Sequence, residues 1–219
     1  MFRGDHPDLA RALHRAPTLA RDLGHPRTGS EHLLLALADL TGHADALRAA
    51  VREVPGDGAG AAADRETLAV LGVDLGDLLG VVDRPPVREP LLPLGARRAR
   101  ERCARLEPPL GLDAQAAYAA SLRLALARRE REHRREHLAL ALVALDPGVA
   151  WLLATARVDR AALLADLATR FPPPRRNPLL RVERRLGHAA RHRGLVRRYE
   201  RTTGREVASG SAVPALILG

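Results

Sequence analysis

Leucine and alanine recur every three to four positions along the first part of the chain, a spacing typical of one face of an α-helix. The pattern predicts a helix over residues 8–23. Its apolar positions are Leu9, Ala12, Leu13, Ala16, Leu19, Ala20 and Leu23. Pro17 lies inside this segment, and an interior proline removes one backbone donor and costs a helix about 3 kcal/mol. We therefore expect a kink or a break at Pro17.

A second apolar run follows, with a helix start of its own. Ser30 precedes Glu31 and a leucine-rich run that ends at Leu40. A serine oxygen can accept from the exposed amides of a first helical turn, and the helix dipole favours a carboxylate there. The sequence therefore predicts a capped, mostly buried helix over residues 31–40. The Gly- and Ala-rich segment at about residues 54–64 is expected to be a turn-rich, flexible insertion.

One short motif occurs twice in the chain. Gly-Ser-Glu-His at residues 29–32 returns as Arg-Arg-Glu-His at residues 134–137, an offset of 134 − 29 = 105 residues, and leucines follow both copies. Further along, Val73-Asp74 corresponds to Val158-Asp159. These pairs lie 73 − 31 = 42 and 158 − 136 = 22 residues after their glutamates, so the first copy carries about 20 extra residues. Such self-similarity predicts a duplicated helical unit.

The composition narrows the class of protein. Hydrophobic residues make up 46% of the 219 residues but aromatic residues only 2%, so the core must consist of Leu, Ala and Val, which suits close-packed helices. The net charge is +9, yet the chain has no lysine, and this all-arginine usage is most simply a coding bias. The single Cys103 excludes an intramolecular disulfide and suits a reducing compartment. With no apolar run of about 18 residues and no signal-like start, we expect a soluble cytoplasmic protein.

Several motifs together resemble a known family. Leu23-Gly24-His25, the segment 29–37 and Leu71-Gly72-Val73-Asp74 resemble the Clp repeat, two of which form the N-terminal domain of ClpC- and ClpA-type AAA+ unfoldases. The start of the chain, Met1-Phe2-Arg3-Gly4, is similar to the start of such unfoldases. Segments 109–112, 148–150 and 158–159 resemble landmarks of the second repeat, so the resemblance covers roughly residues 1–170.

The resemblance implies an all-α fold in which two four-helix repeats pack with pseudo-twofold symmetry, followed by a basic helical tail. The expected boundaries are repeat 1 at 1–83, a Pro- and Arg-rich linker with a short helix at 84–108, repeat 2 at 109–170 and an Arg-rich tail at 171–219. A Walker A motif needs a lysine, and this chain has none. The chain thus resembles the receptor domain of an unfoldase without its motor, and we expect neither catalysis nor a cofactor.

The resemblance also implies a set of ligand-binding residues. Glu31 and Glu136 occupy the two equivalent positions at which ClpC-type domains engage the guanidinium of phosphorylated arginine. The alternative is that each glutamate only caps its own helix. Because the first copy keeps Gly-Ser before its glutamate, we favour Glu31 as the binding residue. Phe2 and Leu110 correspond to a surface that receives apolar substrates and cyclic peptide antibiotics, although burial of Phe2 against the first helix is an equal alternative.

Two histidine patterns invite a metal interpretation. His133-x-x-Glu136-His137 matches the inverted zinc-peptidase motif, but the first copy has the same Glu-His pair without an upstream histidine, so duplication explains it without zinc. His188 and His192 form a four-residue spacing in the tail that is more typical of a solvated face. We therefore predict no metal site.

The sequence favours a non-catalytic binding protein for peptides, phosphoarginine-type ligands or cyclic peptides. Such a protein could be an accessory of the Clp protease system or a decoy for Clp-targeting antibiotics. The first alternative is a nucleic-acid-binding protein that uses the tail, where residues 175–206 hold eleven Arg and three acidic residues. Tyr199 is the only aromatic residue of that segment, so readout of bases has no support. A zinc peptidase is the distant alternative.

Overall fold

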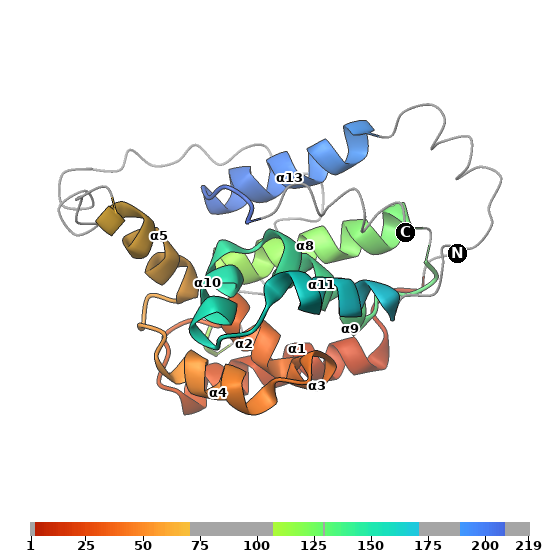
Figure 1. Cartoon of the computed structure of the whole chain (residues 1–219). Coiled ribbons are helices and arrows are strands. Elements are labelled where there is room, and N and C mark those ends of the chain that lie inside the picture. The colour runs from red at the N-terminus through yellow and green to blue at the C-terminus, as the bar shows by residue number, and fades with distance from the viewer. Residues whose placement is uncertain (1–2, 71–106, 129, 171–188, 209–219) are drawn as a thin grey trace.

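The computed structural model describes residues 3–70, 107–128, 130–170 and 189–208, and all regular elements within them are helices (Figure 1). The first repeat contains α1 (Pro7–Asp22), α2 (Ser30–Ala36), α3 (Ala38–Thr41), α4 (Ala44–Arg52) and α5 (Ala59–Val70). The second repeat contains α8 (Leu112–Ala127), α9 (Arg135–Leu145), α10 (Pro147–Thr155) and α11 (Arg160–Thr169), and the tail contains α13 (Ala189–Thr203). The predicted all-α class is confirmed.

The helix boundaries repeat with the offset found in the sequence. Helix α8 begins 112 − 7 = 105 residues after α1, and α9 begins 135 − 30 = 105 residues after α2. Helix α9 spans the counterparts of both α2 and α3, which are separated by Leu37. The counterpart of α11 would follow Val73-Asp74, which lies outside the described residues together with most of the predicted linker and Cys103.

Helix α1 continues through its internal proline. It runs without a break from Pro7 to Asp22, with Pro17 inside it and buried beside Ala16 and Ala20. The expected break is therefore absent. Tertiary packing of this face compensates for the backbone donor that Pro17 lacks, as is common where a helix is held by its neighbours rather than by its own propensity.

The start of α2 differs from the sequence prediction. Gly29, not Ser30, is the N-cap residue. Ser30 is buried, and its backbone N–H and its hydroxyl both donate to Oδ2 of Asp113, at 3.0 and 3.1 Å. Asp113 lies in the first turn of α8, so a carboxylate of the second repeat satisfies the first turn of α2. The prediction that the serine oxygen caps this helix is wrong.

The segment predicted as a flexible insertion is mostly helical. A turn spans residues 54–58, and α5 begins at Ala59. The start of α5 packs against the start of α10 so closely that a Cβ atom on Gly148 would lie 2.6 Å from the backbone nitrogen of Gly60. Glycine at 148 allows this contact, and residues 59–64 are thereby part of the packed structure.

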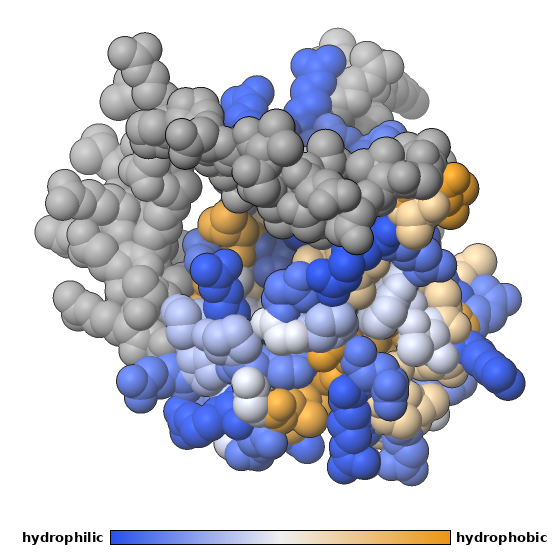
Figure 2. All heavy atoms as spheres, turned by 90° about the vertical axis from the view of Figure 1, so that its left-hand side faces the viewer, coloured by the Kyte–Doolittle hydropathy of each residue, from blue (hydrophilic) through white to orange (hydrophobic). Residues whose placement is uncertain are grey.

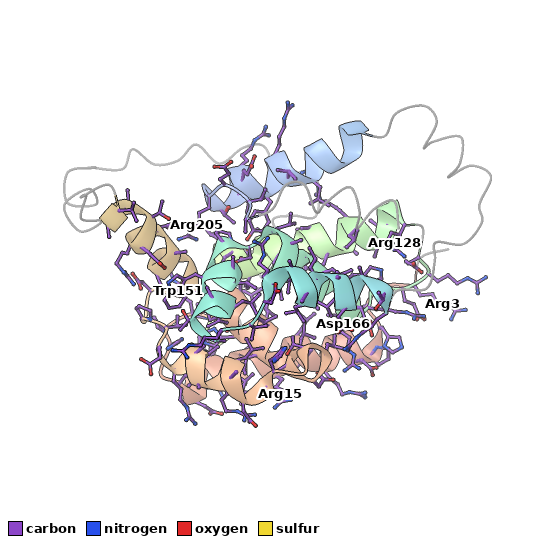
Figure 3. The ribbon with its side chains drawn as sticks, viewed as in Figure 1. Arg3, Arg15, Arg128, Trp151, Asp166 and Arg205 are labelled. Carbon is purple, nitrogen blue, oxygen red and sulfur yellow. The ribbon has the colours of Figure 1, made fainter. Side chains whose placement is uncertain are left out.

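The tail helix is docked on the repeats. Leu195 and Tyr199 of α13 are buried in the same apolar cluster that contains the leucines and alanines of both repeats. The hydroxyl of Tyr199 donates to Oδ2 of Asp146 at 2.5 Å. Just after α13, Arg205 pairs with Asp64 of α5 at 2.8 Å, which places this part of the tail next to the insertion (Figure 3). The predicted basic helix is confirmed over residues 189–203, and its buried side chains are part of the core.

One face of the molecule carries small, separate apolar areas (Figure 2). Figure 2 shows the end of the molecule that carries α5, where hydrophilic residues predominate between small hydrophobic areas. Within the described residues, no single helix is long and apolar enough to cross a membrane. Helices α9 and α10 are long and apolar enough only when they are taken together, and the angle between them is 85°.

Candidate functional site

Two short backbone pairings join the repeats, and each is the symmetry counterpart of the other. His133 donates to the carbonyl of Gly4 at 2.9 Å and accepts from the N–H of His6 at 2.8 Å. In the counterpart, Thr28 donates to the carbonyl of Pro109 at 2.9 Å and accepts from the N–H of Gly111 at 3.0 Å. The offsets 133 − 28, 109 − 4 and 111 − 6 all equal 105. This exchange sets the start of α2 beside the second repeat and the start of α9 beside the first.

In each copy of the repeated motif, the histidine side chain forms a hydrogen bond with the backbone at the start of its helix. The N–H of Gly29 donates to Nδ1 of His32 at 3.0 Å, and the N–H of Arg134 donates to Nδ1 of His137 at 3.0 Å. Both rings are buried. Burial, together with the nearby charges of His133 and Arg128, lowers the pKa of His137 to about 3. His137 is therefore neutral at pH 7, as an accepting Nδ1 requires.

Glu31 is buried, although the resemblance implies that it engages a ligand. Glu31 is 1% exposed, and its Oε1 lies 3.1 Å from Nδ1 of His32. Burial raises the pKa of Glu31, but the interactions with His32, a backbone hydrogen bond and the charge of His25 together lower it further, so the net shift is downward. In this conformation an ionised carboxylate is enclosed at the start of α2, out of reach of a guanidinium from solvent.

Glycine at position 29 makes this enclosure possible. The carboxylate of Glu31 folds back over the helix start into space that a Cβ atom on Gly29 would fill. The turn at 54–58 adds a second glycine, since a Cβ atom on Gly58 would lie 3.7 Å from Oε1 of Glu31. In the second repeat, position 29 corresponds to Arg134, whose side chain excludes the folded-back arrangement.

Glu136 accordingly lies in a different environment. Its side chain is 26% exposed, and its Oε1 lies 3.7 Å from Nε of Arg135. Nη1 of Arg135 is paired at 2.5 Å with Asp39 of α3, and Arg134 is exposed. The start of α9 therefore presents a solvent-accessible carboxylate among arginines. The two glutamates predicted as equivalent ligand-binding residues are not equivalent in the structure.

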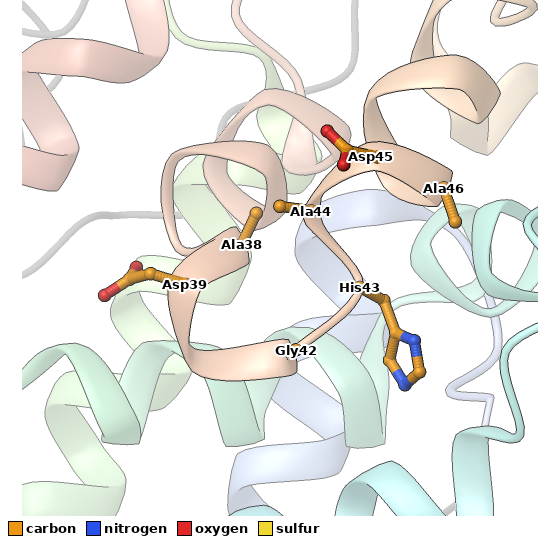
Figure 4. A pocket seen from close by; sticks show the side chains of 7 residues that line it. All are labelled: Ala38, Asp39, Gly42, His43, Ala44, Asp45 and Ala46. Carbon is orange, nitrogen blue, oxygen red and sulfur yellow. The ribbon is translucent and has the colours of Figure 1, made fainter.

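A broad hollow adjoins this second start. It has a volume of about 410 Å³ and lies over the turn between α3 and α4 (Figure 4). It is lined by Ala38, Asp39, Gly42, His43, Ala44, Asp45 and Ala46. Asp39 belongs both to this lining and to the ion pair with Arg135, so the hollow and the charged start of α9 share an edge.

Sequence reasoning missed one residue near Glu31. His25, in the loop after α1, stacks edge-on against His32 with a ring centroid distance of 4.9 Å. Ligand atoms of His25, Glu31 and His32 lie within 4.8 Å of one another. The signal was present, because His25 belongs to the Leu-Gly-His motif that carried the family resemblance. The second repeat has Glu130 at the corresponding position, 25 + 105 = 130.

The inverted zinc-peptidase motif does not form a metal site. Nδ1 of His133 lies 2.8 Å from Oδ1 of Asp5, and its Nε2 lies 2.8 Å from the hydroxyl of Ser121. Both ring nitrogens of His133 are thus engaged within the protein, and Nδ1 of His137 accepts from Arg134. Burial lowers the pKa of His133, although Asp5 raises it in part. This geometry gives these residues a structural role at the seam between the repeats.

Of the remaining candidate site residues, the structure describes the side chain of Leu110 alone. Leu110 is half-buried and pairs with Thr28 in one of the two bridges between the repeats. Phe2, His188 and His192 lie outside the residues whose side chains the structure describes. The suggested surface around Phe2 and Leu110 therefore stays a prediction.

Comparisons with known proteins add one structural likeness. No protein-family profile matches the chain, and no curated protein matches it. Among solved structures, the chain is similar to the N-terminal domain of ClpD, a caseinolytic protease associated chaperone from Arabidopsis thaliana. The match has 15% sequence identity and a TM-score of 0.42, and it covers 76% of this chain and 93% of that one. A likeness of this size establishes neither a family nor a function.

Proposed function

We propose that this chain is a non-catalytic, cytoplasmic binding protein of the Clp receptor type, which captures peptides through phosphorylated arginine at the start of α9. The observation that carries the proposal is the partly exposed carboxylate of Glu136, which lies beside Arg135 and follows the exposed Arg134 in the sequence. The duplicated motifs and their resemblance to Clp repeats support the class of protein.

The charges at this start complement the proposed ligand. A phosphorylated arginine side chain carries a guanidinium group next to a phosphate. A carboxylate can hold the former through charge-assisted hydrogen bonds, and arginine side chains can hold the latter. Glu136 supplies the carboxylate, and Arg134 with Arg135 supplies the positive charge. The enclosed Glu31 lacks an open approach, so the site proposed here is in the second repeat.

The adjoining hollow supplies room for the rest of a peptide. Four of its seven lining residues are alanine or glycine, which leaves space for an extended backbone that continues from the charged start. A cyclic peptide is a second ligand class for the same surface and for the predicted Phe2 and Leu110 region. Either an accessory of a Clp unfoldase or a decoy for antibiotics against it would need such a surface and no ATP.

Calorimetry with free phosphoarginine tests the proposal. We expect binding by the wild type and a loss of about tenfold to 100-fold in affinity for Glu136→Gln, the range of one charged hydrogen bond of about 1.5–3 kcal/mol. Glu66→Gln, an exposed glutamate on α5, is the matched control and should bind like the wild type. Free arginine and inorganic phosphate should each bind more weakly than phosphoarginine.

A well-folded wild type that binds no phosphoarginine would contradict this ligand. Equal loss of affinity in Glu136→Gln and Glu66→Gln would place the ligand away from the start of α9.

A further inference from the structure

Three side chains with metal-binding atoms converge at the start of α2. His25 comes from the loop after α1, and Glu31 and His32 come from the first turn of α2. Their ligand atoms lie within 4.8 Å of one another. Within the described residues, Nδ1 of His25, Oε2 of Glu31 and Nε2 of His32 have no hydrogen-bond partner. Glu31 and His32 are fully buried, where unpaired polar atoms are costly.

One ring nitrogen of His32 has no partner in the described part of the chain and could bind a further ligand. Nδ1 of His32 accepts the N–H of Gly29 at 3.0 Å, which uses the single lone pair of that nitrogen. Nε2 of the same ring is buried and has no hydrogen-bond partner among the described residues. Nε2 is therefore the nitrogen of His32 that could bind a cation.

The three unpartnered atoms are of the kind that binds transition metals. A carboxylate oxygen and imidazole nitrogens with a free lone pair are the forms in which these side chains coordinate such ions.

The second repeat shows what the same motif does without this cluster. It has Glu130 in place of His25, and Glu130 pairs with Arg128 at 3.5 Å. Glu136 is open to solvent beside Arg135, and Arg134 replaces Gly29. In both copies of the Glu-His motif, the histidine thus accepts a hydrogen bond from the backbone N–H of the N-cap residue. The convergence of a carboxylate and a second histidine is specific to the first repeat.

We propose that His25, Glu31 and His32 form a binding site for a divalent transition-metal ion of the zinc class. Two imidazoles and one carboxylate are a ligand set that Zn²⁺ takes with a further position left for water. Nδ1 of His25, Oε2 of Glu31 and Nε2 of His32, which have no other hydrogen-bond partner in the ranges that the structure describes, are the atoms that would bind the ion. The half-exposed ring of His25 gives the ion a route from solvent.

The ion would fasten the loop after α1 to the start of α2. It would neutralise the enclosed carboxylate and leave Glu136 as the open glutamate of the pair. This role needs no bound peptide, so it is independent of the proposed ligand at α9.

Zinc calorimetry on untagged, chelator-treated protein tests the site, with the visible absorption of the Co²⁺ form as a second readout. We expect one Zn²⁺ per chain and the intense bands of a low-coordinate Co²⁺ site. Losing a residue that only orients a metal ligand weakens metal binding about 10- to 100-fold, so losing a ligand itself in His25→Ala or Glu31→Gln should weaken it at least that much. His43→Ala, an exposed histidine in the hollow, is the control and should bind normally.

Two results would overturn the proposal. One is a folded wild type, verified by circular dichroism, that binds no Zn²⁺. The other is stoichiometric binding that survives in His25→Ala and Glu31→Gln, or that disappears in His188→Ala/His192→Ala, which would place the ion in the tail. Since His25 is half-exposed, His25→Ala keeps the test meaningful even if Glu31→Gln fails to fold.

Discussion

The carboxylate of Glu31 occupies the space that a side chain at position 29 would need. This relationship separates the two copies of the repeated motif, because the second copy has Arg134 where the first has Gly29. One substitution at a helix start therefore accounts for one glutamate being enclosed and the other being open.

Gly29→Ala should destabilise the protein and displace Glu31. Overpacking of this kind costs about 1–3 kcal/mol of unfolding free energy, measured by urea denaturation. Gly56→Ala is the control, because a Cβ atom there would meet only Cδ of Pro26 at 4.0 Å, and it should cost little. Equal effects of the two substitutions would contradict the enclosed position of Glu31.

Tyr199→Phe should loosen the tail from the repeats. The substitution leaves Oδ2 of the buried Asp146 without its donor, at a cost of about 1–3 kcal/mol. Tyr118→Phe makes the same chemical change at an exposed hydrogen bond to Asp5 and should cost less. Urea denaturation of both variants measures the difference. If Tyr118→Phe were the more damaging, the docking of α13 through Tyr199 would be wrong.

Lowering the pH should destabilise the fold through His137. Its pKa is about 3 in the folded state, whereas an unperturbed histidine has a pKa of about 6.5. Between these values the unfolded chain binds more protons, so the unfolding free energy falls as the pH falls. For this group alone the loss is about 2 kcal/mol between pH 6.5 and 5.

His137→Asn isolates that contribution. The asparagine Oδ1 can accept the N–H of Arg134 but cannot take up a proton in this range. Denaturation at several pH values should therefore show a shallower decline than in the wild type, while His43→Asn keeps the full decline. An unchanged slope in His137→Asn would show that other groups cause the acid sensitivity.

The exposed arginines of α13 should be dispensable for ligand binding. Arg197, Arg198 and Arg201 face solvent, so replacing all three by Gln should preserve the fold and leave the affinity for phosphoarginine within about twofold. A nucleic-acid role predicts instead a salt-dependent affinity for DNA that drops in this variant. Deleting the whole tail would confuse the two cases, because it removes the buried Tyr199.

The sequence was sufficient to predict the duplication, the all-α class and the starts of the repeated helices. These features depend on local periodicity and on a constant offset, both of which a single sequence displays. The docking of α13 was not predictable in this way, because Tyr199 meets Asp146 across 53 residues with no shared pattern. The enclosure of Glu31 also depends on how the turn at Gly58 packs over it. The structural role of His133 in the zinc-peptidase pattern depends on contacts with Asp5 and Ser121, which the local sequence does not display.

The two duplicated glutamates are proposed to have different roles, and crossed calorimetry tests this difference most directly. Glu31→Gln and Glu136→Gln are each titrated with Zn²⁺ and with phosphoarginine. We predict that Glu31→Gln loses zinc binding and keeps phosphoarginine binding, and that Glu136→Gln does the reverse. Loss of both ligands in the same variant, or no loss in either variant, would contradict the account.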